Sequence, residues 1–327
     1  LGYIMNKTKK DRQKRSLLVQ VARLYYEQNY NQNEIAKIVN LSRPYISKLL
    51  LEAKETGIVQ ITIKDDVDTE SKKEKQIREF FNLNKVIIAP KSDSQLPLTL
   101  VGEATALYLE SILCDGDIIG YSWGETIYEC AKALSVQEAL KNIVTVQLCG
   151  GVSNTNKNVY VSEISTEFSH KLNSTGYLLP FPAIVDSFHI KDTLYHERSM
   201  QDVLSYASKA NICIITMGKF DTQCAMARVG YLSESEVKQL TTQGVVGDIC
   251  THLIDKEGNL CVPQMDARTV AVPLKTLKNI DTRIGVAVGE DKVYSILGAL
   301  RGNLVNILVT DEATADLLCE ICPEILL

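Results

Sequence analysis

Several features that mark membrane-spanning, secreted or metal-binding proteins are scarce in this sequence. Its 327 residues include one tryptophan and four histidines, and no apolar run approaches the ~18 residues that a membrane-spanning helix needs. Residues 1–16 are basic and polar, so we expect no secretory signal. Nine cysteines are scattered rather than clustered as in a disulfide framework, which indicates reduced thiols in a cytoplasmic protein. Cys319 and Cys322 lack a second Cys or His pair at zinc spacing, so we expect no metal, and nothing predicts a cofactor.

The residues that are present give an ordinary globular composition with an uneven distribution of charge. Hydrophobic residues make up 45% and charged residues 23%, and the length corresponds to about two domains. Residues 1–64 carry 12 Lys and Arg against 5 Asp and Glu, a net charge of +7, whereas the rest carries 23 against 35, a net charge of −12. A basic head on an acidic body is typical of a nucleic-acid-binding module joined to another domain. A basic tail without a partner would have the same charge.

The basic segment has the start signals of three helices. Apolar residues at helical spacing predict a first helix over residues 11–28. Asn31 with Glu34 three residues later predicts the capping box of a second helix. Ser42 followed by Pro44 predicts the start of a third.

The second and third predicted helices have the spacing of a helix-turn-helix. Ala36 allows the helices to approach closely, Asn40 tolerates a left-handed backbone in the turn, and Ile46 packs back on the first helix of the pair. Gly57 is expected to end the third helix. The alternating apolar pattern over residues 59–64 then predicts a strand or wing.

The outer side of the third helix carries residue types that contact bases and phosphates in a major groove. With one residue from the second helix, the candidate DNA-binding residues are Gln32, Ser42, Arg43, Pro44, Tyr45, Ser47 and Lys48. A plain helical hairpin with a basic face, or a three-helix head that binds protein, remains an alternative from these residues alone.

Beyond the head, the sequence predicts a linker and an α/β domain. Residues 1–64 are expected to form the DNA-binding domain, residues 65–84 a linker with a connecting helix, and residues 85–327 an effector and oligomerisation domain. Strands are predicted at 85–89, 117–121, 143–149, 211–216, 284–288 and 306–310, and helices near 71–81, 99–113, 125–134, 161–172, 193–208, 233–243, 292–301 and 313–320. Strands that alternate with helices predict a doubly wound α/β sheet with helices on both faces.

Glycines follow four of the predicted strands, at the end of the sheet where doubly wound folds bind ligands. The loop at Gly124 leads into a helix, whose N-terminus attracts anions. Lys292 lies in the first turn of another helix, where the dipole disfavours a cation unless an anion is near. Asp248 can accept hydrogen bonds from sugar hydroxyls. The candidate effector-binding residues are Ser122, Trp123, Gly124, Glu125, Thr126, Gly150, Gly151, Gly218, Asp248 and Lys292. On this reasoning Gly124 can equally serve only the turn, Asp248 can equally cap one, and Lys292 can equally be a solvated surface residue.

Longer motifs extend over nearly the whole chain. In the head they are Tyr26-Glu27-Gln28, Asn31-Gln32-Asn33-Glu34-Ile35-Ala36, Leu41-Ser42-Arg43, Ile46-Ser47-Lys48-Leu49-Leu50 and Gly57-Ile58-Val59. In the body they are Ser122-Trp123-Gly124-Glu125-Thr126, Gln147-Leu148-Cys149-Gly150-Gly151, Val246-Gly247-Asp248-Ile249, Leu300-Arg301-Gly302 and Leu308-Val309-Thr310-Asp311-Glu312 with Thr314-Ala315. Together they resemble the SorC family of transcriptional regulators, and most of all its deoxyribonucleoside-regulator branch. The resemblance implies a DNA-binding head, a body similar to sugar-phosphate isomerases, a sugar or sugar-phosphate effector that contacts Lys292, and a tetramer built as a dimer of dimers.

Two residues depart from the family pattern. The anion loop of the family often reads Gly-Thr-Thr, whereas this chain has Glu125 after Gly124, and a carboxylate repels a phosphate unless it points away. Members of the branch can carry a lysine before the Gly-Gly pair, whereas this chain has Cys149. Because a cysteine cannot form an imine with an aldehyde sugar, we expect a non-covalent effector, with deoxyribose 5-phosphate as one candidate among several.

The alternative function is a sugar-phosphate isomerase or deaminase with an accessory DNA-binding head. Such chemistry needs a carboxylate base within reach of the substrate carbon and a second acid or base. The segment ending at Cys149 supplies no carboxylate, and the loop of residues 217–221 supplies no histidine. The four histidines lie outside the glycine loops in sequence: His170, His189, His196 and His252. We therefore predict a regulator of a carbohydrate or nucleoside catabolic operon and not an enzyme. Its expected partners are double-stranded operator DNA and a sugar or sugar phosphate, with no membrane.

Overall fold

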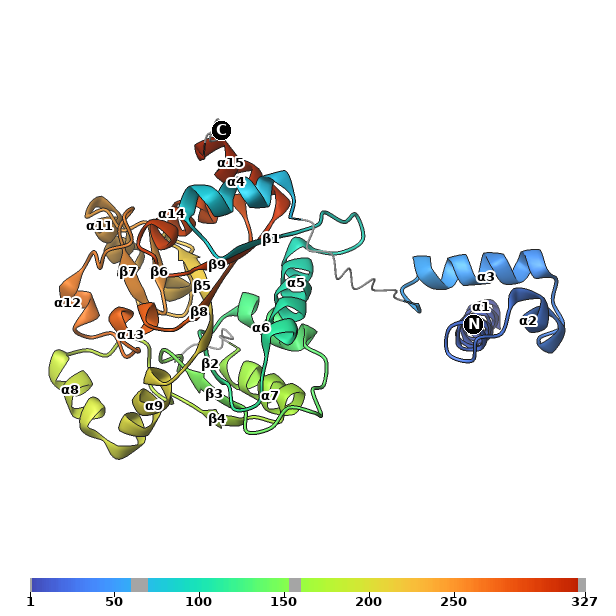
Figure 1. Ribbon diagram of the computed structural model, residues 1–327, viewed down its shortest axis with the longest axis horizontal. Coiled ribbons are helices and arrows are strands. Elements are labelled where there is room, and N and C mark those ends of the chain that lie inside the picture. The colour runs from blue at the N-terminus through green and yellow to red at the C-terminus, as the bar shows by residue number, and fades with distance from the viewer. Residues whose placement is uncertain (1, 60–69, 153–159, 323–327) are drawn as a thin grey trace. The chain divides into compact units, whose positions relative to one another are not determined.

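Three helices make up the N-terminal part of the chain: α1 (Gly2–Tyr26), α2 (Gln32–Ile38) and α3 (Arg43–Glu55) (Figure 1). The computed structural model describes residues 2–59, 70–152 and 160–322, and the chain divides into two compact units, Leu1–Thr69 and Glu70–Leu327. We call the first unit the head and the second the body. The predicted boundary at residue 64, and all but the first residue of the predicted wing, lie outside the described residues.

The ends of α2 and α3 lie where the sequence signals predict them, with a capping box at the start of α2 and with Ser42 as an N-cap without a side-chain hydrogen bond at the start of α3. The Asn31 side chain accepts hydrogen bonds from the backbone N–H groups of Asn33 and Glu34 at 3.0 and 3.1 Å, and the Glu34 carboxylate accepts one from the Asn31 N–H at 2.9 Å. Asn40 has a φ of 52°, the left-handed conformation that the turn requires. Gly57, at a φ of 71°, follows the end of α3.

The head has its own small hydrophobic core, to which all three helices contribute. Its buried residues are Leu18, Val21, Ala22, Ile35, Ile46, Leu49, Leu50 and Ala53. Helix α1 begins at Gly2, well before the predicted start at residue 11. Lysine and methionine in that stretch are good helix formers, so the helix continues beyond the apolar stripe that predicted it.

The body is built on a parallel sheet in the strand order β1-β9-β8-β5-β2-β3-β4 (Figure 1). The strands are β1 (Lys85–Ala89), β2 (Ile118–Tyr121), β3 (Val144–Gln147), β4 (Thr175–Tyr177), β5 (Ile212–Lys219), β8 (Thr282–Ala287) and β9 (Ile307–Asp311). A hairpin of β6 (Gly247–Ile249) and β7 (His252–Ile254) pairs antiparallel with the last residues of β5. Strand order reverses between β2 and β5, which makes their carboxyl ends a topological switch point.

Helices cover both faces of this sheet, as the alternating burial of its central strand requires. Ile212 and Ile214 of β5 join one core cluster, and Cys213, Ile215 and Met217 join the other. The helices of the body are α4 (Lys72–Phe81), α5 (Pro97–Ile112), α6 (Glu125–Ala133), α7 (Val161–Leu172), α8 (Phe188–His196), α9 (Arg198–Ser208), α10 (Ala225–Arg228), α11 (Glu234–Thr242), α12 (Pro263–Asp266), α13 (Leu274–Lys278), η1 (Glu290–Lys292), α14 (Val293–Arg301) and α15 (Glu312–Ile321). The first cluster takes side chains from α5, α6 and α7, and the second from α4, α9, α14 and α15. The predicted doubly wound α/β fold is thereby confirmed.

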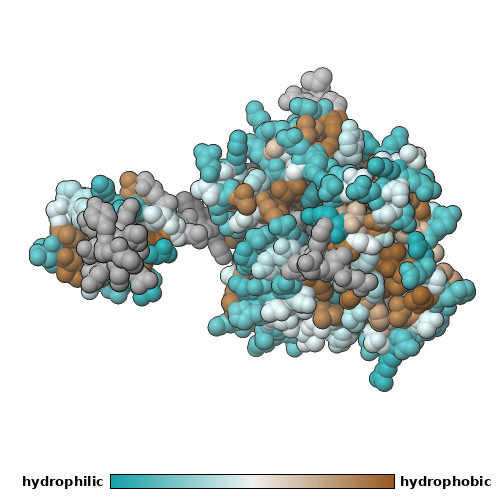
Figure 2. Space-filling view, turned by 180° about the vertical axis from the view of Figure 1, so that it is seen from behind, coloured by the Kyte–Doolittle hydropathy of each residue, from teal (hydrophilic) through white to brown (hydrophobic). Residues whose placement is uncertain are grey.

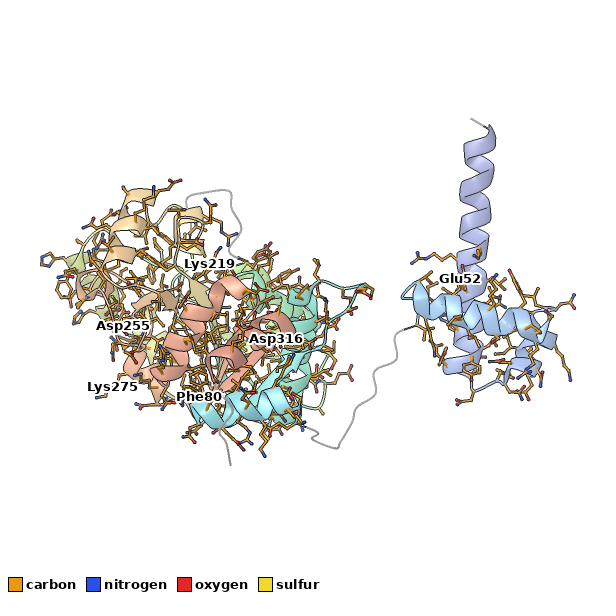
Figure 3. All side chains as sticks on the ribbon, turned by 90° about the horizontal axis from the view of Figure 1, so that it is seen from above. Glu52, Phe80, Lys219, Asp255, Lys275 and Asp316 are labelled. Carbon is orange, nitrogen blue, oxygen red and sulfur yellow. The ribbon has the colours of Figure 1, made fainter. Side chains whose placement is uncertain are left out.

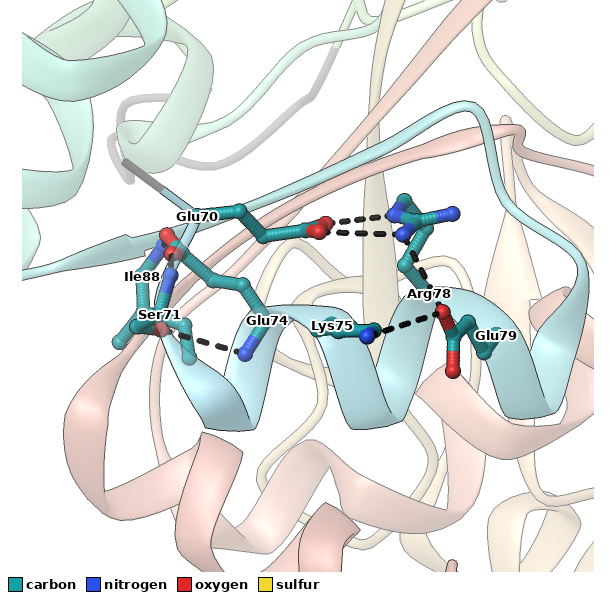
Figure 4. Close-up of polar contacts among 7 residues, drawn as sticks. All are labelled: Glu70, Ser71, Glu74, Lys75, Arg78, Glu79 and Ile88. Atoms are coloured by element: carbon teal, nitrogen blue, oxygen red, sulfur yellow. Dashed lines mark hydrogen bonds and ion pairs between the residues drawn. The ribbon is translucent and has the colours of Figure 1, made fainter. Parts of the chain in front are cut away.

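The segment expected as a connecting helix is α4, and it packs on the body. Ile77 is buried in the body core. The Glu74 carboxylate accepts a hydrogen bond from the Ser71 N–H at 2.7 Å, which caps α4, and one from the Ile88 N–H of β1 at 2.9 Å (Figure 4). One side chain therefore both begins the helix and fixes it to the sheet.

In the described part of the chain, none of the helices is long and apolar enough to span a bilayer. Figure 2 shows hydrophilic residues interspersed with hydrophobic ones over the face of the body turned to the viewer. Isolated apolar side chains are exposed, such as Leu96 and Tyr294, which is ordinary for a globular domain.

Candidate functional site

A cavity of about 170 Å³ lies at the switch point of the body sheet. Its wall is formed by the loop after β2, the carboxyl ends of β3 and β5, the tip of the β6–β7 hairpin, helix α10 and the end of η1. Eight of the ten predicted effector-binding residues line it: Ser122, Trp123, Gly124, Glu125, Thr126, Gly218, Asp248 and Lys292. Segments more than 150 residues apart in the chain thus meet in one place.

The loop from β2 to α6 presents a helix N-terminus to the cavity. The Ser122 hydroxyl accepts a hydrogen bond from the Thr216 N–H at 3.1 Å, which ties the loop to β5. Gly124 has a φ of 119°, a backbone conformation that other residues rarely adopt, and α6 begins directly after it. The first N–H groups of a helix and the positive end of its dipole favour an anion at this point.

Glu125, the first residue of α6, is exposed at the mouth of the cavity. A carboxylate at this position interacts favourably with the helix dipole. Because water surrounds it, its repulsion of an anion in the cavity is screened. The presence of Glu125 therefore does not exclude a phosphate.

Gly150 and Gly151 do not line the cavity, in contrast to the prediction. The Gly150 carbonyl instead accepts a 2.8 Å hydrogen bond from the Trp123 indole N–H. A Cβ on Gly151 would lie 3.2 Å from Cδ1 of the Trp123 ring. Gly151 therefore packs against the tryptophan, which does form part of the wall, whereas a Cβ on Gly150 would lie 2.6 Å from the carbonyl oxygens of Phe181 and Pro182.

Asp248 lies on β6 and faces the cavity with a carboxylate that burial makes difficult to ionise. Its Oδ2 accepts a hydrogen bond from the Thr251 N–H at 3.1 Å, so the residue caps the hairpin turn as well. A Cβ on Gly218 would lie 2.1 Å from Asp248 Oδ1, which explains why β5 carries a glycine there. Burial raises the pKa of Asp248 to about 6, although the Thr251 N–H and the charges of His252 and Lys292 oppose the shift.

Three basic residues approach the same cavity: Lys219, Arg228 and Lys292. Lys219 forms ion pairs with Asp221 at 3.0 Å and Asp291 at 2.7 Å (Figure 3 labels Lys219). Within the part of the chain that the structure describes, no hydrogen bond or ion pair engages the Lys292 ammonium. Burial lowers the pKa of Lys292, with partial opposition from Asp291 and Asp248. The cavity therefore suits a ligand that brings negative charge or many oxygens.

Two thiols, Cys149 and Cys250, form another part of the wall and contact each other. The hydrogen bond to Cys149, together with burial, raises the pKa of Cys250 well above its ordinary value. Neutral thiols are weak hydrogen-bonding groups and weak nucleophiles. This side of the cavity is consistent with non-covalent binding.

A second cavity, of about 410 Å³, lies beside the carboxyl ends of β1 and β9. Its acidic residues are already engaged within the protein: Asp311 accepts hydrogen bonds from the Gly289 N–H and the Thr314 hydroxyl, at 2.9 and 2.6 Å. Glu312 and Asp316 pair with Lys73 (Figure 3 labels Asp316). The first cavity, where the half-buried Lys292 has no ion-pair partner among the described residues, is therefore the better candidate for a ligand.

The candidate DNA interface lies on the head. Ile46 is fully buried against the head core, and around it the side chains of α3 and its N-cap are exposed: Ser42, Arg43, Pro44, Tyr45, Ser47 and Lys48. Gln32, at the start of α2, is half-buried. This places a basic, partly aromatic surface on the N-terminal half of α3, the part that enters a major groove in helix-turn-helix proteins.

Several residues of the cavity wall escaped the sequence prediction. Arg228 lies on the four-residue helix α10, which has no periodic pattern. Thr251 follows the predicted Asp248 by three residues, but nothing in the sequence indicated a hairpin there. His252 lies next to it, buried between the Asp266 carboxylate and the Val272 carbonyl, and so closer to the cavity than its sequence position implied.

Known proteins share both parts of this architecture. The family model described as "Putative sugar-binding domain" matches residues 65–320. The chain is 34% identical over 307 residues to the deoxyribonucleoside regulator of Bacillus subtilis (strain 168), covering 93% of this chain and 97% of that protein. It is 31% identical over 306 residues to the sorbitol operon regulator of Klebsiella pneumoniae, covering 92% and 97%. The crystal structure of the full-length sorbitol operon regulator SorC from Klebsiella pneumoniae matches with a TM-score of 0.78 at 31% identity, covering 93% of this chain and 98% of that one. These relatives are transcriptional regulators, not enzymes.

Proposed function

This chain belongs to the SorC family of sugar-binding transcriptional regulators, and we propose that a sugar or sugar phosphate bound in the switch-point cavity controls the affinity of the head for operator DNA. The observation that carries the proposal is the convergence on one cavity of an anion-favouring helix N-terminus, a half-buried carboxylate and a lysine without an ion-pair partner among the described residues, in a chain that also has a helix-turn-helix head. Its mechanism is linkage: the effector and the operator prefer different states of the protein.

The proposed effector is anionic at one end and rich in hydroxyls at the other. The α6 N-terminus at Gly124, Lys292 and Arg228 supply positive potential, which favours a phosphate. Asp248 accepts hydrogen bonds from hydroxyl groups. Two relatives are named "Deoxyribonucleoside regulator" and "Sorbitol operon regulator", and this supports a sugar or nucleoside catabolic operon as the target.

The proposed operator contact is made by the exposed residues of α3 and by Gln32. Arg43 and Lys48 can bind guanine edges or phosphates, and Ser42, Tyr45 and Ser47 can bind phosphates. Helix-turn-helix proteins generally bind paired half-sites as symmetric oligomers. We accordingly propose a cytoplasmic homotetramer, which native mass spectrometry would detect as four copies of the chain.

The test is a binding screen on the full-length chain. Duplexes enriched from a random library by the protein serve as operator, and their binding is followed by fluorescence anisotropy. We expect at least one probe among ribose 5-phosphate, deoxyribose 5-phosphate, glucose 6-phosphate and the free sugars to raise the melting temperature and shift operator affinity. Enrichment of no duplex, or stabilisation by no sugar, contradicts the proposal.

A further inference from the structure

The tip of the β6–β7 hairpin has a backbone conformation that residues of its types rarely adopt. Ile249 pairs with His252, so Cys250 and Thr251 alone make the turn. Both have positive φ, 48° and 70°, the pattern of a type I′ turn, which asparagine and glycine adopt easily. A β-branched residue in this region is a genuine outlier. Such strain persists where the surroundings enforce it, often at ligand sites.

The Thr251 hydroxyl is also unsatisfied. The residue is 2% exposed and forms part of the cavity wall, and its Oγ1 has no hydrogen-bond partner among the described residues. A buried hydroxyl is normally hydrogen-bonded, and an exception calls for a physical reason. Because Oγ1 has almost no accessible surface, a ligand atom in the cavity becomes its partner when the side chain turns toward the cavity.

Contacts on both sides of the turn hold its backbone in place. The Thr251 N–H donates to Asp248 Oδ2 at 3.1 Å. The ring of His252 is fixed between the Asp266 carboxylate and the Val272 carbonyl, with 2.9 Å from Nε2 to the carbonyl oxygen. The turn is therefore held on both sides, and its strained residue forms part of the cavity wall.

We propose that Thr251 is a specificity-determining residue of the effector site, whose hydroxyl hydrogen-bonds a hydroxyl group of the bound sugar. The proposal rests on the assignment of this cavity as the effector site. Asp248 lies beside Thr251 and accepts hydrogen bonds, so a sugar hydroxyl at this point meets both an acceptor and a hydroxyl that can donate. A sugar without that hydroxyl gives Thr251 no hydrogen-bond partner and binds more weakly. This difference in affinity discriminates between effectors.

The test compares Thr251→Val, which removes the hydroxyl and keeps the β-branched shape, with Thr105→Val as a matched control. Thr105 is also buried, but its hydroxyl donates to the Val101 carbonyl at 2.7 Å and lies on α5. For full-length Thr251→Val we expect the dissociation constant of a sugar phosphate that binds the wild type to rise about three- to tenfold. The affinity of Thr251→Val for inorganic phosphate should equal that of the wild type, and the melting temperature of the variant without ligand should not fall. Thr105→Val should lower the melting temperature and leave the sugar affinity unchanged.

A second variant separates the strain from the hydroxyl. Glycine adopts a positive φ without strain, so we expect Thr251→Gly to raise the melting temperature of the protein without ligand. We also expect it to weaken binding of the sugar phosphate, as Thr251→Val does. Equal affinity of wild type and Thr251→Val for every sugar phosphate that binds overturns the proposal while leaving the effector site intact. A melting temperature that falls in Thr251→Val as it does in Thr105→Val identifies the hydroxyl as structural and also overturns it. If neither a free sugar nor a sugar phosphate binds the wild type, the proposed function fails and this inference with it.

Discussion

Lys292 and Asp248 face the same cavity, and burial shifts both toward their neutral forms. It lowers the pKa of Lys292 and raises that of Asp248 to about 6. Each charge partly offsets the shift of the other, but neither has a direct ion-pair partner among the described side chains. A ligand with an anionic end and a hydroxyl-bearing end provides interaction partners for both groups.

For Lys292→Ala we expect loss of the effector response with operator binding intact, because the DNA contacts are assigned to the head. Loss of a charge-assisted hydrogen bond costs about 1.5–3 kcal/mol, so the effector dissociation constant should rise about ten- to a hundredfold. Lys275→Ala is the control, since Lys275 is exposed on α13 and lies outside the cavity wall (Figure 3). An unchanged effector titration midpoint in folded Lys292→Ala would remove Lys292 from the site.

Asp248→Asn tests the buried carboxylate through pH. The folded-state pKa of about 6 exceeds the ordinary 3.8, so the folded state binds more protons between about pH 4 and 6. Raising the pH through that window therefore lowers the free energy of unfolding of the wild type, by about 1–3 kcal/mol. Asparagine does not titrate, so the free energy of unfolding of Asp248→Asn does not fall in this pH window. We expect Asp248→Asn to be more stable than wild type at pH 7 and of similar stability near pH 4.

Urea denaturation of both proteins at pH 4, 5.5 and 7 measures this difference. Asp93→Asn, at an exposed loop position, should show no pH-dependent gain. A constant difference between wild type and Asp248→Asn across the three pH values would mean that the Asp248 carboxyl titrates normally.

Site residues were predictable where backbone topology alone places them. Ser122 to Thr126 directly follow a strand, and Lys292 follows another with only a short turn between, so the rule that ligands bind at the carboxyl ends of strands was enough. Arg228 reaches the cavity from a short helix, and Thr251 from the tip of an antiparallel hairpin. Their places depend on long-range packing that no local pattern encodes.

Among the elements, α3 carries the testable surface of the head. Arg43 and Lys48 are exposed near its N-terminus, and Lys54 is exposed near its C-terminus, 6.0 Å from the ring centroid of Tyr26. We expect Arg43→Ala and Lys48→Ala each to weaken operator binding, by about 1–3 kcal/mol with relaxed sequence preference if a base contact is lost. Loss of a phosphate contact should instead weaken binding to all DNA sequences alike. It should also reduce the slope of log affinity against log salt concentration by about one.

Lys54→Ala is the matched control, because it removes the same charge from the other end of the same helix. Anisotropy titrations at several salt concentrations distinguish the two kinds of contact. Wild-type operator affinity in Arg43→Ala, Lys48→Ala and the double variant would remove this face of α3 from the interface.

Two parts of the fold show why helix boundaries and short strands were harder to predict than long helices and strands. The predicted helix at 193–208 is two helices, α8 and α9, separated at Glu197, whose ψ is 139°. No glycine or proline marks that break. The β6–β7 hairpin was missed because Cys250 and Thr251 are not the residues that type I′ turns favour, and their conformation is enforced by tertiary contacts.

At the scale of the whole molecule, the proposed function is a coupling between operator binding by the head and effector binding by the body. Linkage requires the coupling to be reciprocal: the factor by which the effector changes operator affinity equals the factor by which operator changes effector affinity. Typical coupling of about 1–3 kcal/mol corresponds to about 5- to 150-fold. This equality holds whether the effector releases the operator or strengthens its binding.

The most direct test measures both factors on the full-length wild-type chain. Operator affinity is determined by anisotropy with and without a saturating sugar phosphate, and the affinity for the same sugar phosphate is determined by calorimetry with and without saturating operator. We expect two equal factors of at least about fivefold, both abolished in Lys292→Ala at the same sugar concentration. A sugar phosphate that binds the body while leaving operator affinity unchanged would contradict the account.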